Sequence, residues 1–202
     1  MSSTHWDRIF ADTETERLGW FENDLSPTLE RLAVLGSLEG KTVFLPGVGT
    51  SGLASSLLDQ GATLVLNDIS PEALRLLQAK VPADAPVTWL SQDISEPLPP
   101  ALGGVDVWID RAVLHFLTAE SQIQRYFDNL RRVLKRGGHA LFAEFARDGA
   151  IKCAGLDVHQ YDASELAERL GPGFRVLERW NHVYHTPAGD ARPYVYALFR
   201  RE

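Results

Sequence analysis

The sequence contains little cysteine, no excess of basic residues and no long apolar run. Cys153 is its single cysteine, so the 202-residue chain cannot form an internal disulfide, which fits a reducing cytoplasm. The formal net charge of −7 argues against a broad nucleic-acid-binding surface. No apolar stretch approaches the roughly 20 residues that span a bilayer, and the charged residues 1–10 do not form a secretory signal. We therefore expect a cytoplasmic protein with neither nucleic-acid nor membrane partners.

One glycine-rich stretch, residues 43–52, dominates the first half of the chain. An apolar run ends in Gly47-Val48-Gly49-Thr50-Ser51-Gly52, and a helical pattern follows. Glycines let a ligand approach the backbone, and the N-terminus of a helix offers free N–H donors. Asp68 follows Gly49 by 19 residues at the end of a second apolar run, where a carboxylate can bind both hydroxyls of a ribose. The pattern predicts a nucleoside-containing cofactor without specifying which one. A P-loop is excluded because Leu53 stands where its lysine should be.

Strand-like and helix-like patterns alternate along most of the chain. We expect parallel strands at residues 41–45, 63–67, 86–90, 105–109 and 139–145, with helices on both faces of the sheet. Ser26, Ser70 and Thr118 are predicted helix N-caps, and Gly137-Gly138 is predicted to end the helix after Thr118. Two late β-rich runs, residues 174–185 and 193–200, are too close for a crossover and are predicted to be antiparallel. The expected fold is α/β: a Rossmann-like, doubly wound, seven-stranded sheet that is mostly parallel with an antiparallel last strand.

A nicotinamide oxidoreductase is one interpretation of the glycine pattern. Its support is weak, because an antiparallel final strand is less expected of a nicotinamide-binding domain. A short-chain reductase would also need a Tyr-x-x-x-Lys pair, and none of Tyr126, Tyr161 and Tyr184 has a lysine four residues later. The sequence therefore lacks the residue pair with which a short-chain reductase would carry out hydride transfer.

Four motifs in order resemble those of class I S-adenosylmethionine-dependent methyltransferases. They are Gly47-Val48-Gly49, Asn67-Asp68-Ile69-Ser70, Gln92-Asp93-Ile94 and Leu134-Lys135-Arg136-Gly137-Gly138-His139. The resemblance implies S-adenosyl-L-methionine as cofactor. It implies that Gly47 and Gly49 allow close approach of the methionine end. Asp68 would bind the ribose, Ile69 would pack on the adenine, and Asp93 would accept from its amine with Ile94 alongside.

The N-terminal aromatics sharpen the resemblance. Composition alone predicts a helical arm docked on the core. Trp6-Asp7, Phe10 and Trp20-Phe21, however, resemble a group of small bacterial methyltransferases related to eukaryotic methyltransferase-like proteins, some of which modify protein lysines. The resemblance implies that Trp6, Phe10 and Trp20 line the cofactor pocket. Residues 110–116 also resemble the bacterial members, which implies that Asp110 and Arg111 lie at the cofactor.

The expected reaction is in-line displacement of the activated methyl group by an acceptor. His115 is the candidate general base, with Asp110 as a second catalytic candidate; the alternative is that His115 is a structural residue satisfied by hydrogen bonds. No Cys/His group has zinc spacing, so no metal is expected.

We expect one methyltransferase domain over residues 1–202. Its predicted parts are an arm or lid (1–40), a cofactor-binding core (41–145) and an acceptor-side region (146–202). The expected acceptor is a small molecule. The alternatives are a protein lysine and a non-catalytic cofactor-binding module.

Overall fold

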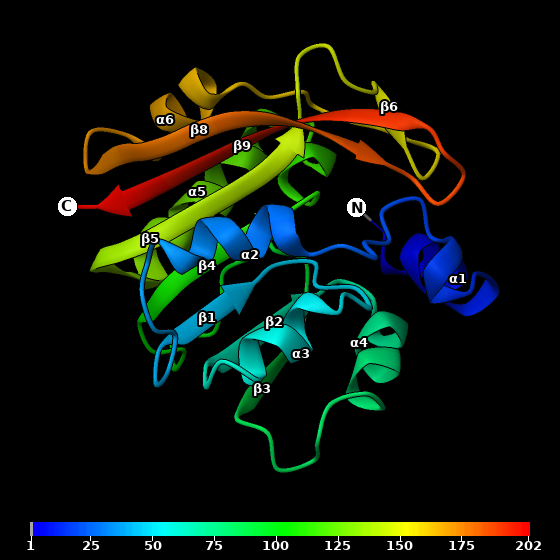
Figure 1. Cartoon of the computed structure of the whole chain (residues 1–202), viewed down its shortest axis with the longest axis horizontal. Coiled ribbons are helices and arrows are strands. Elements are labelled where there is room, and N and C mark those ends of the chain that lie inside the picture. Colours follow the sequence, from blue (N-terminus) through cyan, green and yellow to red (C-terminus); the bar gives the residue numbers. More distant parts are fainter. Residues whose placement is uncertain (1) are drawn as a thin grey trace.

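The computed structural model describes residues 2–202, so Met1 of the predicted domain lies outside the described residues. Its main feature is a seven-stranded sheet with the order β3-β2-β1-β4-β5-β9-β8 (Figure 1). The strands are β1 Thr42–Leu45, β2 Thr63–Asp68, β3 Val87–Ser91, β4 Val105–Arg111, β5 Leu134–Phe145, β8 Phe174–His185 and β9 Ala191–Arg201. β1 to β5 pair in parallel, whereas β9 is antiparallel to both β5 and β8. The predicted fold class and the late antiparallel pair are confirmed.

Helices cover both faces of the sheet. On one face α2 (Ser26–Ala33), α3 (Leu53–Leu58) and α4 (Pro71–Gln78) pack their leucines into one core cluster. On the other face α5 (Glu120–Val133) and α6 (Ala163–Leu170) pack into a second cluster. The remaining elements are α1 Ser3–Asp12, the short 3₁₀ helices η1 Thr15–Arg17 and η2 Leu114–Phe116, and a small hairpin, β6 Lys152–Cys153 and β7 Leu156–Asp157. Among residues 2–202, no helix is both long and apolar enough to cross a bilayer.

Helix ends follow the predicted capping only in part. Ser70 caps α4, because its Oγ accepts a hydrogen bond from Ala73 N at 3.1 Å. Ser26 is instead the first residue of α2, and its N–H donates to Asp24. Thr118 is not the cap of α5, since extended backbone continues to Ala119 and the helix begins at Glu120.

The prediction that Gly137-Gly138 ends α5 was also wrong. The helix ends at Val133, and Leu134 already pairs with Val105 of β4. The two glycines lie inside β5, where the register with β4 shifts between Val105 and Val107.

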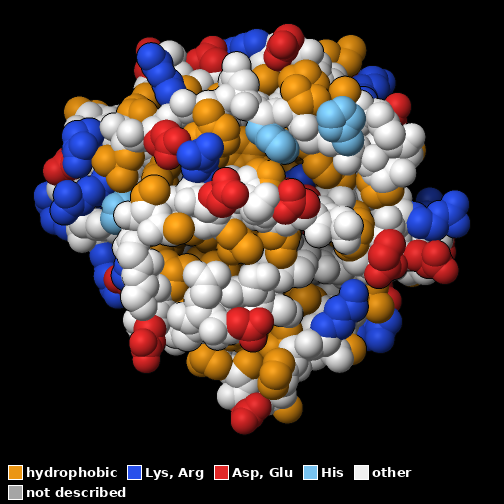
Figure 2. Space-filling model, viewed as in Figure 1, with side chains coloured by type: hydrophobic (Ala, Val, Ile, Leu, Met, Phe, Trp, Pro, Cys, Tyr) orange, Lys and Arg blue, Asp and Glu red, His pale blue; other side chains and the backbone are white. Residues whose placement is uncertain are grey.

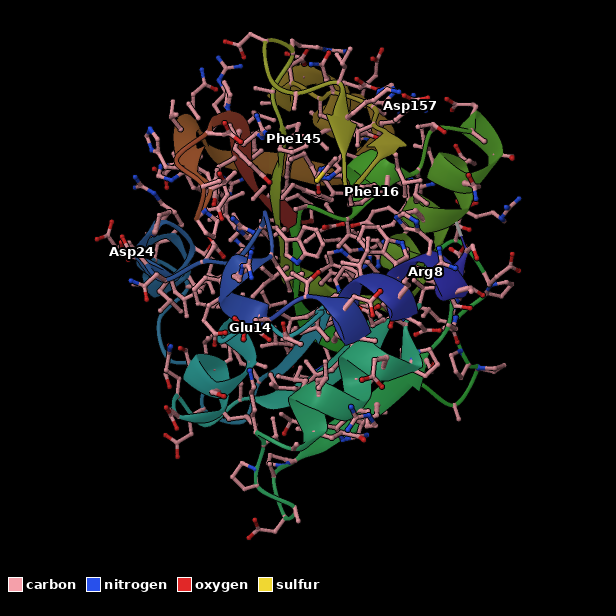
Figure 3. The ribbon with its side chains drawn as sticks, turned by 90° about the vertical axis from the view of Figure 1, so that its right-hand side faces the viewer. Arg8, Glu14, Asp24, Phe116, Phe145 and Asp157 are labelled. Carbon is pink, nitrogen blue, oxygen red and sulfur yellow. The ribbon has the colours of Figure 1, made fainter. Side chains whose placement is uncertain are left out.

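The strand order reverses between β1 and β4, and open α/β sheets bind ligands at the carboxyl ends of such strands. The loop after β1 is fixed there, because Val48 N donates to Asn67 O on β2 at 2.9 Å. Helix α1 lies at the same end of the sheet, beside α4 (Figure 1). Figure 3 looks onto this edge, with Phe116 beside α1.

Candidate functional site

The glycine turn after β1 forms the floor of a pocket. Gly47 and Gly49 have φ angles of +49° and +55°, which side-chain-bearing residues rarely adopt. A Cβ on Gly47 would lie 2.4 Å from Val113 Cγ2, and one on Gly49 would lie 3.3 Å from Phe10 Cζ. Both glycines are therefore needed for the backbone shape and for the close approach of neighbouring side chains.

Asp68 at the end of β2 holds this turn in place. Its Oδ2 accepts a hydrogen bond from Gly49 N at 2.8 Å, and its Oδ1 accepts one from Ser70 N at 2.8 Å. Burial raises the pKa of Asp68 to about 6, although the two backbone donors favour the carboxylate. A single carboxylate thus joins the glycine turn to the start of α4 at the edge of the pocket.

Three aromatic side chains from the N-terminal arm form what we call the aromatic roof: Trp6, Phe10 and Trp20. Trp6 and Phe10 are one helical turn apart on α1 and are both buried. The ring of Trp20 meets Trp6 and Phe10 edge-on, with centroid distances of 5.7 and 6.1 Å. Asp7 ties α1 to the core by accepting from Ser70 Oγ at 2.6 Å. The roof therefore closes over Gly49 from the side opposite the sheet.

Arg111, the last residue of β4, fastens the arm to the sheet. Its Nε lies 2.7 Å from Glu22 Oε1, and its Nη1 donates to Trp20 O at 3.1 Å. The guanidinium carbon lies 5.0 Å from the ring centroid of Tyr184, whose hydroxyl donates to Phe21 O at 2.5 Å. Burial raises the pKa of Glu22 even though Arg111 favours its ionised form. Residues 20–22 are thus held from both β4 and β8.

One pocket brings together most of the predicted cofactor residues. It is lined by Trp6, Phe10, Trp20, Gly47, Gly49, Asp68, Ile69 and Arg111. Sequence reasoning missed Glu22, Val113, Phe116 and Cys153 as lining residues. Glu22 directly follows the aromatic pair Trp20-Phe21, and Val113 and Phe116 belong to a stretch already singled out as family-like. Only proximity to these motifs could have indicated them.

Two predicted adenine contacts do not line this pocket. Ile94 is buried in the core cluster under α5, and its carbonyl accepts a hydrogen bond from Asn129 Nδ2 at 2.8 Å. Asp93 Oδ1 accepts from Ser95 N at 2.8 Å, forming a local turn after β3. The adenine contacts of Asp93 and Ile94 therefore stay predictions, and the lining of the pocket does not support them.

The two predicted catalytic side chains, Asp110 and His115, also lie outside the pocket lining. Side chains alternate along β4, so Arg111 faces the pocket while Asp110 faces α5 and accepts from Tyr126 OH at 2.5 Å. The His115 ring is fully buried, stacks on Phe145 and has its Nδ1 2.8 Å from Glu144 Oε2. Burial lowers the pKa of His115 to about 3. Neither ring nitrogen makes a hydrogen bond with residues 2–202, so burial and stacking hold the ring, and the catalytic role of His115 stays a prediction.

A second hollow lies on the other side of residues 20–22. It shares Phe21 and Glu22 with the main pocket, and acidic and histidine side chains line it (Figure 2). Within residues 2–202, no group of three histidine, cysteine or acidic side chains is arranged to hold a metal ion.

Comparison with known proteins gives one family match and supports the fold. Residues 45–142 match a family model described as a methyltransferase domain. None of the curated proteins compared with the sequence matches it.

Solved structures resemble the whole chain at low sequence identity. A methyltransferase from Anabaena variabilis is 16% identical with a TM-score of 0.77, covering 99% of this chain and 95% of its own. The N-methyltransferase NodS from Bradyrhizobium japonicum, solved with S-adenosylhomocysteine, is 19% identical with a TM-score of 0.75, covering 98% and 97%. The 1,6-didemethyltoxoflavin methyltransferase from Burkholderia thailandensis is 20% identical with a TM-score of 0.69, covering 98% and 84%.

Proposed function

We propose that the chain is a class I S-adenosylmethionine-dependent methyltransferase that uses S-adenosyl-L-methionine as its cofactor and a small molecule as its methyl acceptor. The enclosure of the pocket carries this proposal. Trp6 and Phe10 are only 7% and 6% exposed, and residues 20–22 are fastened across the pocket by Arg111 and Tyr184. A protein lysine would need an open groove for the flanking chain. The Burkholderia neighbour, solved with bound 1,6-didemethyltoxoflavin, supports a small acceptor by analogy.

The residues of the pocket fit the cofactor. Gly47 and Gly49 line the pocket without side chains of their own, and Asp68 presents a buried carboxylate at its edge. Each carboxylate oxygen has two acceptor positions, so Asp68 can bind ribose hydroxyls while retaining Gly49 N and Ser70 N. In this proposal Ile69 packs beside the adenine, and the aromatic roof covers the methionine end.

S-adenosylmethionine supplies an electrophilic methyl group on a sulfonium when bound. The protein contributes alignment of the two reactants, exclusion of water and charged groups around the reacting atoms. The faces of Trp6, Phe10 and Trp20 are suited to a sulfonium cation. Arg111 does not oppose that cation strongly, because Glu22 neutralises it at 2.7 Å.

The titratable side chains that line the pocket are Glu22, Asp68, Arg111 and Cys153. Glu22 is paired with Arg111, Asp68 is assigned to the ribose, and burial raises the pKa of Cys153 to about 11. We therefore propose that alignment and desolvation drive the transfer, without a dedicated general base.

The test has two stages. Binding of S-adenosylhomocysteine is measured by calorimetry and should stabilise the fold by about 2.7 kcal/mol at 100 times its dissociation constant. The enzyme is then incubated with methyl-labelled S-adenosylmethionine and cell extract separated by ultrafiltration into metabolites and proteins. Label in the metabolite fraction supports the proposal. Label only in the protein fraction would overturn the small-molecule acceptor in favour of a protein acceptor.

A further inference from the structure

Two buried carboxyl groups hold one stretch of backbone behind the pocket. Asp110 Oδ1 accepts from Val113 N at 3.1 Å, and Glu144 Oε2 accepts from His115 N at 3.2 Å. Two backbone N–H groups of one short stretch, those of Val113 and His115, therefore depend on two side chains, one from β4 and one from β5. Such anchoring is costly to remove, because buried unpaired N–H groups are strongly disfavoured.

The two carboxyl groups interact with one another and are sealed from solvent. Burial and the charge of Glu144 raise the pKa of Asp110 well above its usual range, and both side chains are fully buried. Because two adjacent carboxylates repel in a low-dielectric core, the pair retains a proton near neutral pH. The titratable groups that face the pair are His115, Tyr126, Tyr161 and Arg111.

The anchored backbone belongs to residues 111–116, which we call the pocket-wall segment. It touches both ligand-covering parts of the site. Val113 packs directly on Gly47, where even a methyl group would not fit. Phe116 packs edge-on against Trp6 of the aromatic roof, with ring centroids 4.9 Å apart. The left-handed φ of +66° at Ala112 shows that this backbone shape is maintained against a local preference.

We propose that Asp110 and Glu144 are positioning residues for cofactor binding. Their hydrogen bonds to the backbone hold the pocket-wall segment, so that Val113 sets the glycine turn and Phe116 sets the roof. Neither side chain lines the pocket, so both act through the segment. The inference rests on the cofactor site of the proposed function and is independent of the acceptor.

The test compares two substitutions at Glu144 with a matched core change. Glu144→Gln keeps an acceptor for the backbone and offers an amide donor to Asp110. Glu144→Leu removes the acceptor at similar size. Phe199→Leu, whose ring packs on Phe142, reports general loosening of the same core. Folding of each variant is verified by circular dichroism at the temperature of measurement.

Affinity for S-adenosylhomocysteine is the first readout. We expect Glu144→Leu to weaken it about tenfold, with Phe199→Leu within about twofold of the wild type. The wild type should bind more weakly above pH 8, where the pair loses its proton, and Glu144→Gln should not show this loss. Equal affinity in Glu144→Leu, or equal weakening in Phe199→Leu, would overturn the proposal while leaving the proposed function intact.

Amide hydrogen exchange of the ligand-free protein is the second readout. Exchange at residues 113–115 should accelerate in Glu144→Leu and not in Phe199→Leu. This measurement needs no cofactor, so it decides the positioning role even if the wild type fails to bind S-adenosylhomocysteine. Unchanged protection in Glu144→Leu would refute the anchoring.

Discussion

Arg111 and Glu22 form a buried ion pair, 2.7 Å from Nε to Oε1, that joins the end of β4 to the N-terminal arm. The two side chains are 11% and 7% exposed. Removing one partner of such a pair leaves an uncompensated charge in a site without water. This lowers the stability of the fold much more than the loss of a surface ion pair does. The arm is thus attached by charge as well as by its aromatic rings.

Replacing Glu22 by Gln should therefore lower the free energy of unfolding by about 3 kcal/mol, measured by urea denaturation. Glu178→Gln is the matched control, because Glu178 pairs with Arg31 at 2.9 Å with both side chains about one third exposed. That substitution should change stability by less than about 1 kcal/mol. Similar effects for the two variants would show that the Arg111 pair contributes no more than a surface pair.

Asp68→Ala should weaken binding of S-adenosylhomocysteine at least tenfold, on the order of 1.4 kcal/mol, because it removes the proposed ribose acceptor. The hydrogen bonds from Gly49 and Ser70 also predict a loss of about 1–3 kcal/mol in unfolding free energy. Asp68→Asn keeps one acceptor and should lie between the wild type and Asp68→Ala in both measurements. Wild-type affinity in Asp68→Ala would remove the ribose assignment.

Binding should also depend on pH through Asp68. The pKa of this carboxyl is about 6, so it gains a proton as the pH falls from 7.5 to 5 and becomes a poorer acceptor. Calorimetry across that range should show affinity falling below pH 6. Asp68→Asn should lack this dependence.

Gly47→Ala tests the contact between the glycine turn and the pocket-wall segment. The left-handed φ costs about 1–2 kcal/mol for a residue with a side chain, and the clash with Val113 adds to it. Adding Val113→Ala should remove the clash and leave only the free-energy cost of the left-handed backbone at residue 47. The double variant should therefore be more stable in urea than Gly47→Ala alone. No recovery would mean that Val113 does not limit the turn.

Stability should vary with pH in two opposite ways. Burial raises the pKa of Glu144 to about 8, so the folded state retains a proton that the unfolded state loses above about pH 4.5. Its contribution is lost as the pH rises from about 4.5 through about 8, at up to about 1.4 kcal/mol per pH unit. Burial lowers the pKa of His115 to about 3, so stability is lost as the pH falls from 6.5 toward 3. Urea unfolding should show that Glu144→Gln flattens the alkaline decline and leaves the acidic one.

The fold and half of the site follow from local sequence chemistry. The glycine turn, Asp68 and the antiparallel final pair each come from patterns within a few residues. The direction of Asp110 does not, because alternation along β4 shows only that it and Arg111 face opposite ways. The α5 contact with Tyr126 decides which of them faces the pocket. Glu22 and Glu144 were missed because their partners are distant in sequence, and the burial of Ile94 in the core under α5 depends on contacts that local sequence does not show.

The fastening of residues 20–22 also has a consequence for synthesis of the chain. The bond from Arg111 to Trp20 O spans 91 residues, and that from Tyr184 to Phe21 O spans 163. The arm leaves the ribosome first, yet its last attachment point is in β8. A nascent chain can therefore complete the sheet through β5 and still carry an open site, which becomes enclosed only when translation reaches the final hairpin.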